Sequence, residues 1–314
     1  MNMAVDFSII IPHFNSVKLI TELLESLLNF NECDNLEIII VDDNSPVECY
    51  DEISRINREK YDNKIRILKN NSKFSGAGAA RNVGLQVAQG KWILFADADD
   101  LFFPNFYQTI HEYIKTDADV VFFVPASINH ERADDKRVYT YLKQFEQYFE
   151  KGVEDGLRYN LPIVWSRLYQ HDFLKKNQIT FSNTRVSNDV MFSLKVGVCA
   201  RKVKVIDKSI YIWRFTEGSL TTKMNKDAFK QRMEVVITAN RYLKENLERK
   251  VFLKNRYTLP RYIALSLFRN KMGLIYTFKL ISKLLKANFG IVKTSDFTHT
   301  SNFFKNNRLY KKNG

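Results

Sequence analysis

Short apolar runs alternate with amphipathic stretches along the first 125 residues of the chain. In the stretch 16–30, pairs of leucine or isoleucine recur every fourth residue, which predicts a helix with one apolar stripe. Five other runs are short, apolar and rich in β-branched residues, as is typical of buried strands: FSIII (7–11), LEIIIVD (36–42), KIRIL (64–68), WILFAD (92–97) and DVVFFV (119–124). This alternation predicts an α/β fold with a mainly parallel, doubly wound sheet flanked by helices.

Capping residues indicate where the other helices begin and end. We expect Ser45 and Pro46 as the N-cap and first residue of the second helix. Gly90 is expected to close the third helix, and Pro104 to start the fourth.

Composition limits the class of protein. A chain of 314 residues, 45% hydrophobic and 26% charged, is expected to fold as one large domain or a domain with an appendage. Cys33, Cys49 and Cys199 are too few and too widely spaced for a disulfide framework or a CxxC metal site, so we expect a reducing, cytoplasmic compartment. The N-terminus has the pattern of a first strand rather than a signal peptide, and no apolar run of about 18 residues predicts a membrane-spanning helix.

The net charge of +13 is concentrated near the C-terminus. Residues 241–314 hold 17 Lys and Arg against 3 Asp and Glu, whereas residues 1–240 hold 31 against 32. This division predicts a boundary near 220–240 and a basic tail that binds something anionic: lipid headgroups, nucleic acid or a charged polymer.

Polar loops follow four of the predicted strands. In such sheets, ligands bind beyond the carboxyl ends of the strands, so these loops are expected to converge on one site. Taken singly, each also has the residues of an ordinary turn or helix cap. The four loops are PHFN (12–15), DDNS (42–45), SGAGAARNVG (75–84) and DADD (97–100).

The acidic loop, DADD, carries three neighbouring carboxylates, which a nearby positive charge would stabilise. Asp97, Asp99 and Asp100 repel one another and raise one another's pKa unless a cation lies among them. Carboxylates in this arrangement suit Mn²⁺ or Mg²⁺, which usually share their other positions with phosphates and water. The preceding glycine loop also favours an anion: Gly76 and Gly78 permit a close backbone approach, and Arg81 replaces the third glycine of the dinucleotide-binding pattern. Arg81 could hold a phosphate or carboxylate, or be a salt-bridged surface arginine.

Five segments occur in the order and spacing of family 2 glycosyltransferases, and the chain resembles that family. Its members are inverting enzymes with a GT-A fold that use nucleotide-diphosphosugars. Over about residues 7–220, the chain is similar to the members of this family that synthesise bacterial cell-surface polysaccharides. The matching segments are SIIIPHFN, IIIVDDNS, GAGAARNVGL, GKWILFADADD and NDVMFSL.

The resemblance implies a donor site for a UDP-sugar. Pro12 and Phe14 would bracket the uracil, Asp43 would bind the base, and Asp99 would be the metal ligand together with Asp97. Asp100 is expected to cap the following helix. The implied donor-binding residues are Pro12, Phe14, Asn15, Asp42, Asp43, Gly76, Arg81, Asn82, Asp97 and Ala98.

The resemblance also implies a catalytic base. Asp189 matches the second residue of an acidic pair whose Glu is here Asn188. As the base, Asp189 would take a proton from an acceptor hydroxyl while the nucleoside diphosphate departs, in one displacement that inverts the anomeric carbon. Without the resemblance, Asp189 would be read as a helix N-terminal residue stabilised by the dipole.

Further residues are expected on the acceptor side, and Asn188 is one of them. In the segment 161–174, Trp165 is either a stacking platform for a sugar or a core residue. Arg214 and Ser219, in the segment 211–221, would close over the diphosphate, while His13 is taken as a variable position.

The expected organisation is a catalytic domain over 1–225, followed by a helical basic region over 226–314. The catalytic domain would comprise a nucleotide-sugar half (1–125) and an acceptor half (126–225). In the basic region, the stretch 261–290 predicts helices with Lys279, Lys283 and Lys286 on one face. These helices would pack on the catalytic domain, bind an anionic membrane surface through 241–314, or both, which would place the enzyme on the inner face of the cytoplasmic membrane near a glycan or lipid-linked acceptor.

Other classes of protein fit less well. A nicotinamide-dependent dehydrogenase needs a glycine fingerprint where this chain has PHFN. A sugar-nucleotide nucleotidyltransferase, or a nucleic-acid-binding protein that uses the basic tail, remains an alternative, although no nucleic acid is expected as a partner. The sequence leaves the donor sugar, the acceptor, the linkage and the oligomeric state open.

Overall fold

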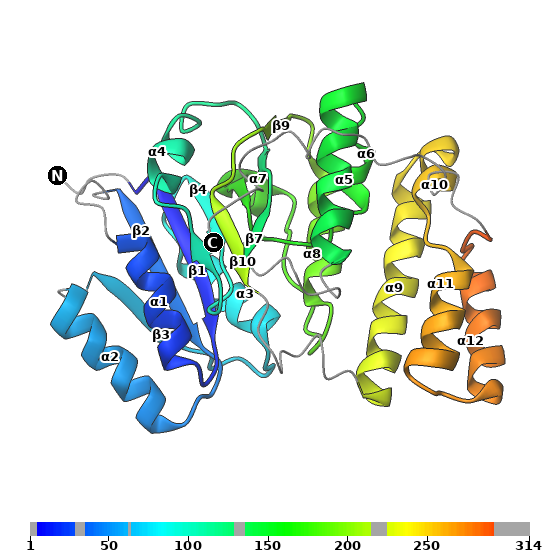
Figure 1. Ribbon diagram of the computed structural model, residues 1–314, viewed down its shortest axis with the longest axis horizontal. Coiled ribbons are helices and arrows are strands. Elements are labelled where there is room, and N and C mark those ends of the chain that lie inside the picture. Colours follow the sequence, from blue (N-terminus) through cyan, green and yellow to red (C-terminus); the bar gives the residue numbers. More distant parts are fainter. Residues whose placement is uncertain (1–4, 29–34, 62–63, 129–135, 215–224, 292–314) are drawn as a thin grey trace. The chain divides into compact units, whose positions relative to one another are not determined.

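The computed structural model describes residues 5–28, 35–61, 64–128, 136–214 and 225–291 (Figure 1). The chain forms two compact units. The sheet unit comprises Met1–Leu142 and Ile163–Thr216, and the helical unit comprises Lys143–Pro162 and Glu217–Gly314. This partition differs from the predicted division at residue 225 mainly because residues 143–162 belong to the helical unit.

A seven-stranded sheet with the order β3-β2-β1-β4-β8-β6-β9 forms the centre of the sheet unit. Neighbouring strands run parallel except at β8, which is antiparallel to both β4 and β6. The predicted α/β class and mainly parallel sheet are confirmed. The strands are β1 (Phe7–His13), β2 (Leu36–Asp42), β3 (Ile65–Lys69), β4 (Trp92–Phe95), β6 (Val120–Phe123), β8 (Arg167–Gln170) and β9 (Val203–Ile206).

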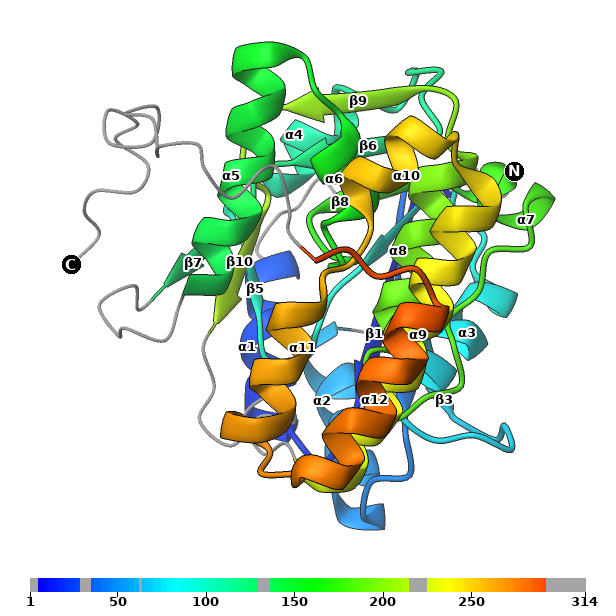
Figure 2. The same cartoon turned by 90° about the vertical axis from the view of Figure 1, so that its right-hand side faces the viewer.

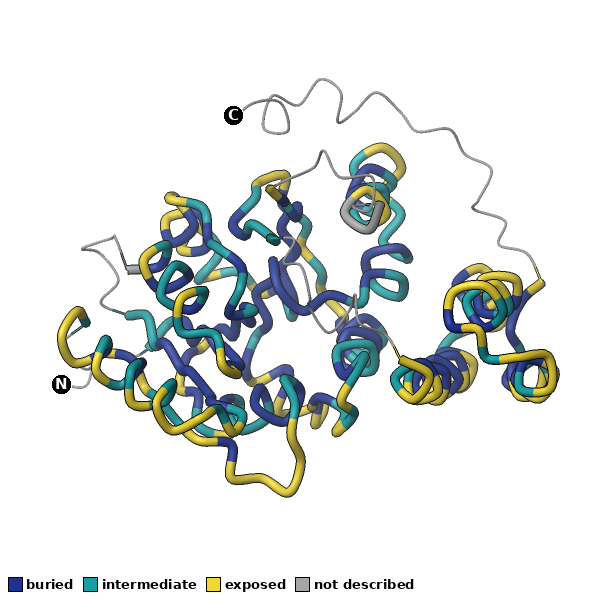
Figure 3. The backbone as a smooth tube through the Cα atoms, turned by 60° about the horizontal axis from the view of Figure 1, so that its bottom comes forward, coloured by how far each residue is buried: buried dark blue, intermediate teal, exposed yellow. Residues whose placement is uncertain are grey.

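Helices cover both faces of this sheet. Because crossovers between parallel strands are right-handed, α1 (Val17–Leu28) and α2 (Val47–Tyr61) lie on one face and α3 (Ala77–Val87) on the other. All seven residues of β1 are therefore buried. Figure 3 colours the chain by burial, with buried segments in dark blue and exposed segments in yellow. Gly84 lets α3 approach β1 closely, since a Cβ there would lie 2.4 Å from Ile10 Cγ2.

A second, three-stranded sheet begins directly after the acidic loop. It has the order β5-β10-β7, with β5 at Leu101–Phe102, β7 at Ala126–Ile128 and β10 at Tyr211–Arg214. The sequence pattern did not predict it, because two to four residues are too few to show a period.

Three predicted helix boundaries need correction. Helix α2 begins at Val47, so Pro46 precedes the helix and is not its first residue. The fourth helix, α4 (Phe106–His111), begins two residues after Pro104, because residues 104–105 form a turn and Asn105 is at the N-cap position. Helix α3 ends at Val87, so Gly90 does not close it. Gly90 instead lets the chain pass close to β1, where a Cβ would lie 2.5 Å from the backbone nitrogen of Ser8.

The sheet unit has two further helices of note, α7 (His171–Lys176) and α8 (Asn188–Cys199), and α5 (Lys136–Lys151) crosses into the helical unit. The helical unit holds α6 (Asp155–Tyr159), α9 (Lys226–Asn246), α10 (Arg249–Asn255), α11 (Leu259–Ala264), the π-helical turn η1 (Leu265–Arg269) and α12 (Leu274–Lys286). None of the helices within the described ranges is long and apolar enough to cross a membrane.

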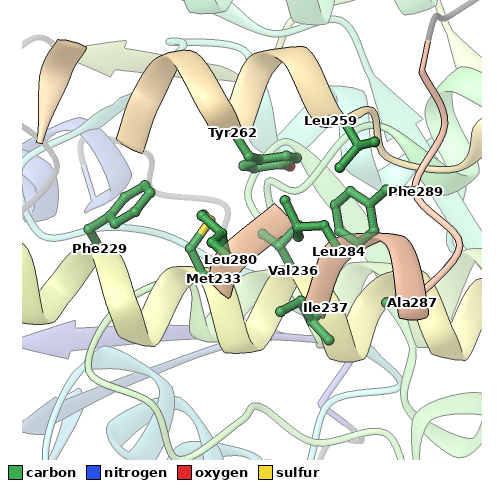
Figure 4. Packing of buried hydrophobic residues seen from close by; sticks show 10 residues of the cluster. All are labelled: Phe229, Met233, Val236, Ile237, Leu259, Tyr262, Leu280, Leu284, Ala287 and Phe289. Carbon is green, nitrogen blue, oxygen red and sulfur yellow. The ribbon is translucent and has the colours of Figure 1, made fainter. Parts of the chain in front are cut away.

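The helical unit has a hydrophobic core of its own. Helices α9, α11 and α12 lie side by side (Figure 2) and bury ten hydrophobic residues between them and the segment after α12 (Figure 4). Asn240 of α9 reinforces this core, because its amide donates to the Ala287 carbonyl at 2.6 Å and accepts from the Tyr257 backbone N–H at 2.8 Å. The core residues are Phe229, Met233, Val236, Ile237, Leu259, Tyr262, Leu280, Leu284, Ala287 and Phe289.

Candidate functional site

The polar loops predicted to converge do lie at one edge of the sheet. Strands β1, β2 and β4 are parallel, so the segments that follow them leave the sheet at the same edge. His13, at the end of β1, is in register with Asp42, at the end of β2. The candidate site is built from these strand ends and the beginning of α8.

The acidic loop is fixed by β10. Asp100 is fully buried and accepts hydrogen bonds from the Tyr211 hydroxyl at 2.7 Å and the Arg214 backbone N–H at 2.8 Å. The same Tyr211 oxygen accepts from the Asp97 backbone N–H at 2.8 Å. Burial, with the nearby charges of Asp97 and Asp99, raises the pKa of Asp100 well above its usual range. The predicted helix-capping role of Asp100 is therefore wrong, because its carboxyl group is turned into the small sheet.

Arg81 connects the acidic loop to the start of α8. Its side chain is buried and forms an ion pair with the partly exposed carboxylate of Asp97. A second guanidinium nitrogen donates to Asn188 Oδ1 at 3.1 Å, and the guanidinium lies 5.2 Å from the centre of the Phe181 ring. Since Asp189 follows Asn188, one side chain links the predicted donor side to the predicted base.

Asp97 and Asp99 suit a divalent cation that is only partly held by protein. Both are partly exposed, while Asp100 is directed away from them toward Tyr211. Among the described residues, no group of three His, Cys, Asp or Glu side chains is placed to hold a metal. Mg²⁺ commonly binds through one or two carboxylates and takes its other ligands from phosphates and water, so the two carboxylates fit this mode.

His13 organises the first two loops. Its Nδ1 lies 3.0 Å from Asp42 Oδ1, and its Nε2 accepts from the Ser16 backbone N–H at 3.1 Å. Asp42 in turn accepts from the Ser45 backbone N–H at 3.1 Å. Burial lowers the pKa of His13 below its usual value, against the opposing effect of Asp42. His13 was taken as a variable position; the only sequence signal was its place at a strand end opposite an acidic strand end.

Asp43 ties the glycine loop to β2. Its two carboxylate oxygens accept from the Asn70 amide and the Gly76 backbone N–H, each at 2.6 Å. Gly76 has a φ of 104°, a conformation that favours glycine. Phe14, on the neighbouring loop, is 61% exposed and presents an open ring.

The remaining loop residues lie around these anchors. Pro12 and Ala98 are buried, and Asn15 donates its backbone N–H to Ser45 Oγ at 2.9 Å.

Other small or polar residues of the glycine loop bind protein. A Cβ at Gly78 would lie 2.7 Å from Asn188 Cβ, so the close approach predicted there is made by α8. Asn82 donates to the Phe181 carbonyl at 3.0 Å and accepts from the Phe181 N–H at 2.8 Å. A contact between Asn82 and nucleotide stays a prediction.

The predicted acceptor residues have different surroundings. Trp165 is 6% exposed and stacks on Tyr211 with ring centres 5.2 Å apart, so the core alternative describes it and the predicted stacking platform for a sugar does not. Arg214 is bound through its guanidinium to Glu22 and to the Asp99 carbonyl, and its closure over the diphosphate stays a prediction. Ser219 lies outside the described residues.

Arg167 in β8 is a buried cation that no sequence pattern marked. Its guanidinium lies 4.5 Å from the centre of the Phe122 ring. Burial lowers the pKa of Arg167, and the charge of Asp189 is among the effects that oppose this shift. The predicted base therefore lies within the electrostatic influence of a buried positive charge.

The family of this chain is shown by a match over more than half of its length. Residues 8–177 match the model of glycosyl transferase family 2, and the chain belongs to this family. The predicted family and enzyme class are confirmed.

Among curated relatives, the glycosyltransferase EpsH of Bacillus subtilis is 26% identical over 245 residues, which cover 76% of this chain and 69% of EpsH. TarS of Staphylococcus aureus, a poly(ribitol-phosphate) beta-N-acetylglucosaminyltransferase, is 28% identical over 221 residues, which cover 68% of this chain and 36% of TarS. A crystal structure of S. aureus TarS 1–349 in complex with UDP-GlcNAc has a similar fold, with a TM-score of 0.68 and 24% identity, covering 90% of this chain and 80% of that one.

Proposed function

We propose that this enzyme transfers a sugar from a UDP-sugar to a hydroxyl group of a glycan or lipid-linked acceptor, with inversion at the anomeric carbon. The observation that carries the proposal is Arg81, which is bound to both Asp97 and Asn188. A sugar diphosphate at this arginine would lie between the acidic loop and the residue before Asp189. The TarS structure, which contains UDP-GlcNAc, supports a UDP-sugar as the donor.

The nucleotide would lie on the loops after β1 and β2. The exposed Phe14 ring offers a face for uracil, with Pro12 and Asn15 beside it in the chain. Asp43 would accept from the base or ribose, and Asp42 would hold the loop through His13. The other proposed donor contacts are those of Gly76, Arg81, Asn82, Asp97 and Ala98.

Asp99, with Asp97, would hold Mn²⁺ or Mg²⁺. When bound, such a cation supplies positive charge that offsets the charge of the departing diphosphate. The guanidinium of Arg81 adds charge and hydrogen bonds on the same side of the site.

Asp189 would act as the base. Its carboxylate takes the proton of the acceptor hydroxyl as that oxygen forms a bond to the anomeric carbon, and the bond to the diphosphate breaks in the same displacement. A donor with an α-linkage therefore gives a β-linked product and free UDP. Asn188 is uncharged, so it accepts a hydrogen bond from Arg81 while the ion pair of Arg81 remains with Asp97.

The acceptor would belong to a bacterial surface polysaccharide. EpsH and TarS are similar over two thirds or more of this chain, and TarS is named for transfer to poly(ribitol-phosphate). Such a role would place the enzyme in the cytoplasm, on the inner face of the membrane, and capsule, lipopolysaccharide and other wall glycans are all candidate pathways.

The first test is calorimetric titration of UDP with Mn²⁺, with EDTA, and with the variant Asp99→Ala. We expect binding that requires both the metal and Asp99, since the cation links carboxylate to diphosphate. Asp51→Ala, at an exposed position of α2, is the matched control and should bind as the wild type does. Equal binding in all four conditions would contradict the metal-diphosphate arrangement.

The second variant, Asp189→Asn, separates binding from chemistry. It should retain UDP binding while turnover of the donor falls by about 10² to 10⁴, the usual contribution of a positioned base. Turnover would be followed as UDP release with candidate UDP-sugars and an acceptor extract. Wild-type turnover in Asp189→Asn would rule out this residue as the base.

A further inference from the structure

Exposed apolar side chains lie along one side of α12 in the helical unit. Leu274 is 67% exposed, Ile275 77% and Phe278 70%, and Leu285 is also exposed. At 3.6 residues per turn, these four positions fall within about one third of the helix circumference. Phe268, at the end of η1 just before the turn into α12, is 78% exposed. We call the four α12 residues the apolar stripe.

Packing of the opposite side of α12 against the core of the helical unit fixes the orientation of the helix, with the apolar stripe exposed. Thr277, Leu280 and Leu284 occupy the opposite side of α12 and are buried, and both leucines point into the cluster with α9 and α11 in Figure 4. A buried hydrogen bond of 2.7 Å joins Thr277 Oγ1 to Ser266 Oγ of η1. The stripe cannot turn inward without breaking these contacts.

A row of lysines borders the apolar stripe. Lys279, Lys283 and Lys286 are exposed on the adjacent side of α12, as their predicted common face requires. Lys283 is bound to Glu234 of α9 at 2.7 Å, which leaves Lys279 and Lys286 as the more available pair. Over residues 249–291, the sequence has ten Lys and Arg and no Asp or Glu.

We infer that the apolar stripe inserts into an anionic lipid surface while the bordering lysines bind the lipid headgroups. A bilayer interface is the partner that accommodates both features, because apolar side chains enter its boundary region and basic residues bind its phosphates. A nucleic acid would use the lysines and leave the stripe in water. A second copy of this chain would bring two segments of like charge together.

This inference extends the proposed transfer reaction and does not require it. Lipid binding through α12 would keep the enzyme at the surface that carries a lipid-linked acceptor. It is measured without donor, metal or acceptor, so its failure is distinguishable from failure of the UDP titration.

The test is co-sedimentation of the full chain with vesicles of phosphatidylcholine alone or mixed with phosphatidylglycerol. We expect binding to the mixed vesicles that weakens as salt rises. The double variant Ile275→Ser and Phe278→Ser should bind at least about tenfold more weakly, since two exposed side chains lose their apolar contact without loss of core packing. Val47→Ser with Tyr139→Ser, both exposed positions outside α12, is the matched control and should bind as the wild type does.

A charge variant tests the second half of the inference. Lys279→Gln with Lys286→Gln should weaken binding to the mixed vesicles by about tenfold or more, because each basic residue near an anionic surface contributes about 1 kcal/mol. Lys60→Gln with Lys64→Gln, two exposed lysines of the sheet unit, should leave binding unchanged.

Three outcomes would overturn the inference. The first is absence of binding to the mixed vesicles, and the second is binding that the α12 serine variants do not change. The third is an oligomer, seen by light scattering, that dissociates in the α12 serine variants, which would assign the stripe to a second copy of the chain.

Discussion

At the scale of single residues, the candidate site depends on side chains whose hydrogen bonds and ion pairs fix the positions of its loops. Arg81 was predicted, and its ion pair with Asp97 brings the glycine and acidic loops together. His13 and Tyr211 were not predicted, although each makes two of the hydrogen bonds that fix a loop. The first of these leads to a prediction about pH.

Protonation of His13 should destabilise the fold. The pKa of His13 is lowered in the folded state, so the unfolded chain takes up the proton more readily as the pH falls below about 6.5. The stability that His13 contributes is therefore complete above that pH and is lost as the pH falls through the folded-state pKa. A protonated Nε2 also cannot accept from the Ser16 N–H.

The measurement is the free energy of unfolding in urea at about pH 8 and about pH 5.5. The loss of stability between them should be smaller in His13→Asn than in the wild type. His111→Asn, at an exposed histidine of α4, is the control and should show the wild-type loss. An equal loss in His13→Asn would contradict the role given to this residue.

The role of a residue could be predicted where neighbouring residues in the sequence determine it. It could not be predicted where a contact with a distant segment determines it. The acidic loop is visible because Asp97, Asp99 and Asp100 are adjacent in sequence. Which of them is buried is decided by Tyr211, more than a hundred residues later, because its hydroxyl binds Asp100. The pairing of His13 with Asp42 likewise depends on strand register, which the sequence does not show.

At the scale of elements, β10 anchors the acidic loop. Tyr211 and Arg214 supply three hydrogen bonds to Asp97 and Asp100. The five runs predicted as strands all proved to be strands. In β1, β4 and β6, burial on both faces leaves a continuous apolar signal. The apolar pattern did not predict β5, β7 and β10, since they are short and their pairing partners are far away in sequence.

Tyr211→Phe should loosen this anchor. The change retains the buried ring but leaves the Asp100 carboxyl group without one donor and the Asp97 N–H without its acceptor. We expect a loss of about 1–3 kcal/mol in the free energy of unfolding and weaker UDP binding in Mn²⁺. Tyr139→Phe, at an exposed tyrosine, should change neither quantity. An unaltered free energy of unfolding in Tyr211→Phe would mean that β10 does not anchor the loop.

At the scale of the whole molecule, the chain leaves and re-enters the sheet unit. Residues 143–162 join the helical unit, where Asp155 pairs with Lys254 at 2.8 Å and Asn160 binds Asn255 at 2.9 Å. The basic composition of 241–314 indicated a separate region, but composition cannot show that an internal segment belongs to it. The predicted division at residue 225 assigns the two partners of each of these contacts to different domains.

A chain ending at residue 225 should therefore be unstable. It would lack the partners of α6 from α10, as well as the core formed by α9, α11 and α12. We expect a lower melting temperature and rapid proteolysis within 143–162. A chain ending at residue 291 is the control, because it retains the helices from α9 to α12 and should melt as the full chain does. Equal melting of the two shortened chains would show that 143–162 does not depend on the helical unit.

The contact between Gly78 and α8 limits how this enzyme could be diversified by directed evolution. A Cβ at position 78 would lie 2.7 Å from Asn188 Cβ and 2.8 Å from the Ser182 carbonyl oxygen. The second obstacle is backbone, so no exchange of the side chain at position 188 removes it. A mutant library around this site should therefore keep position 78 as glycine, and it should keep Asn188, whose side chain binds Arg81.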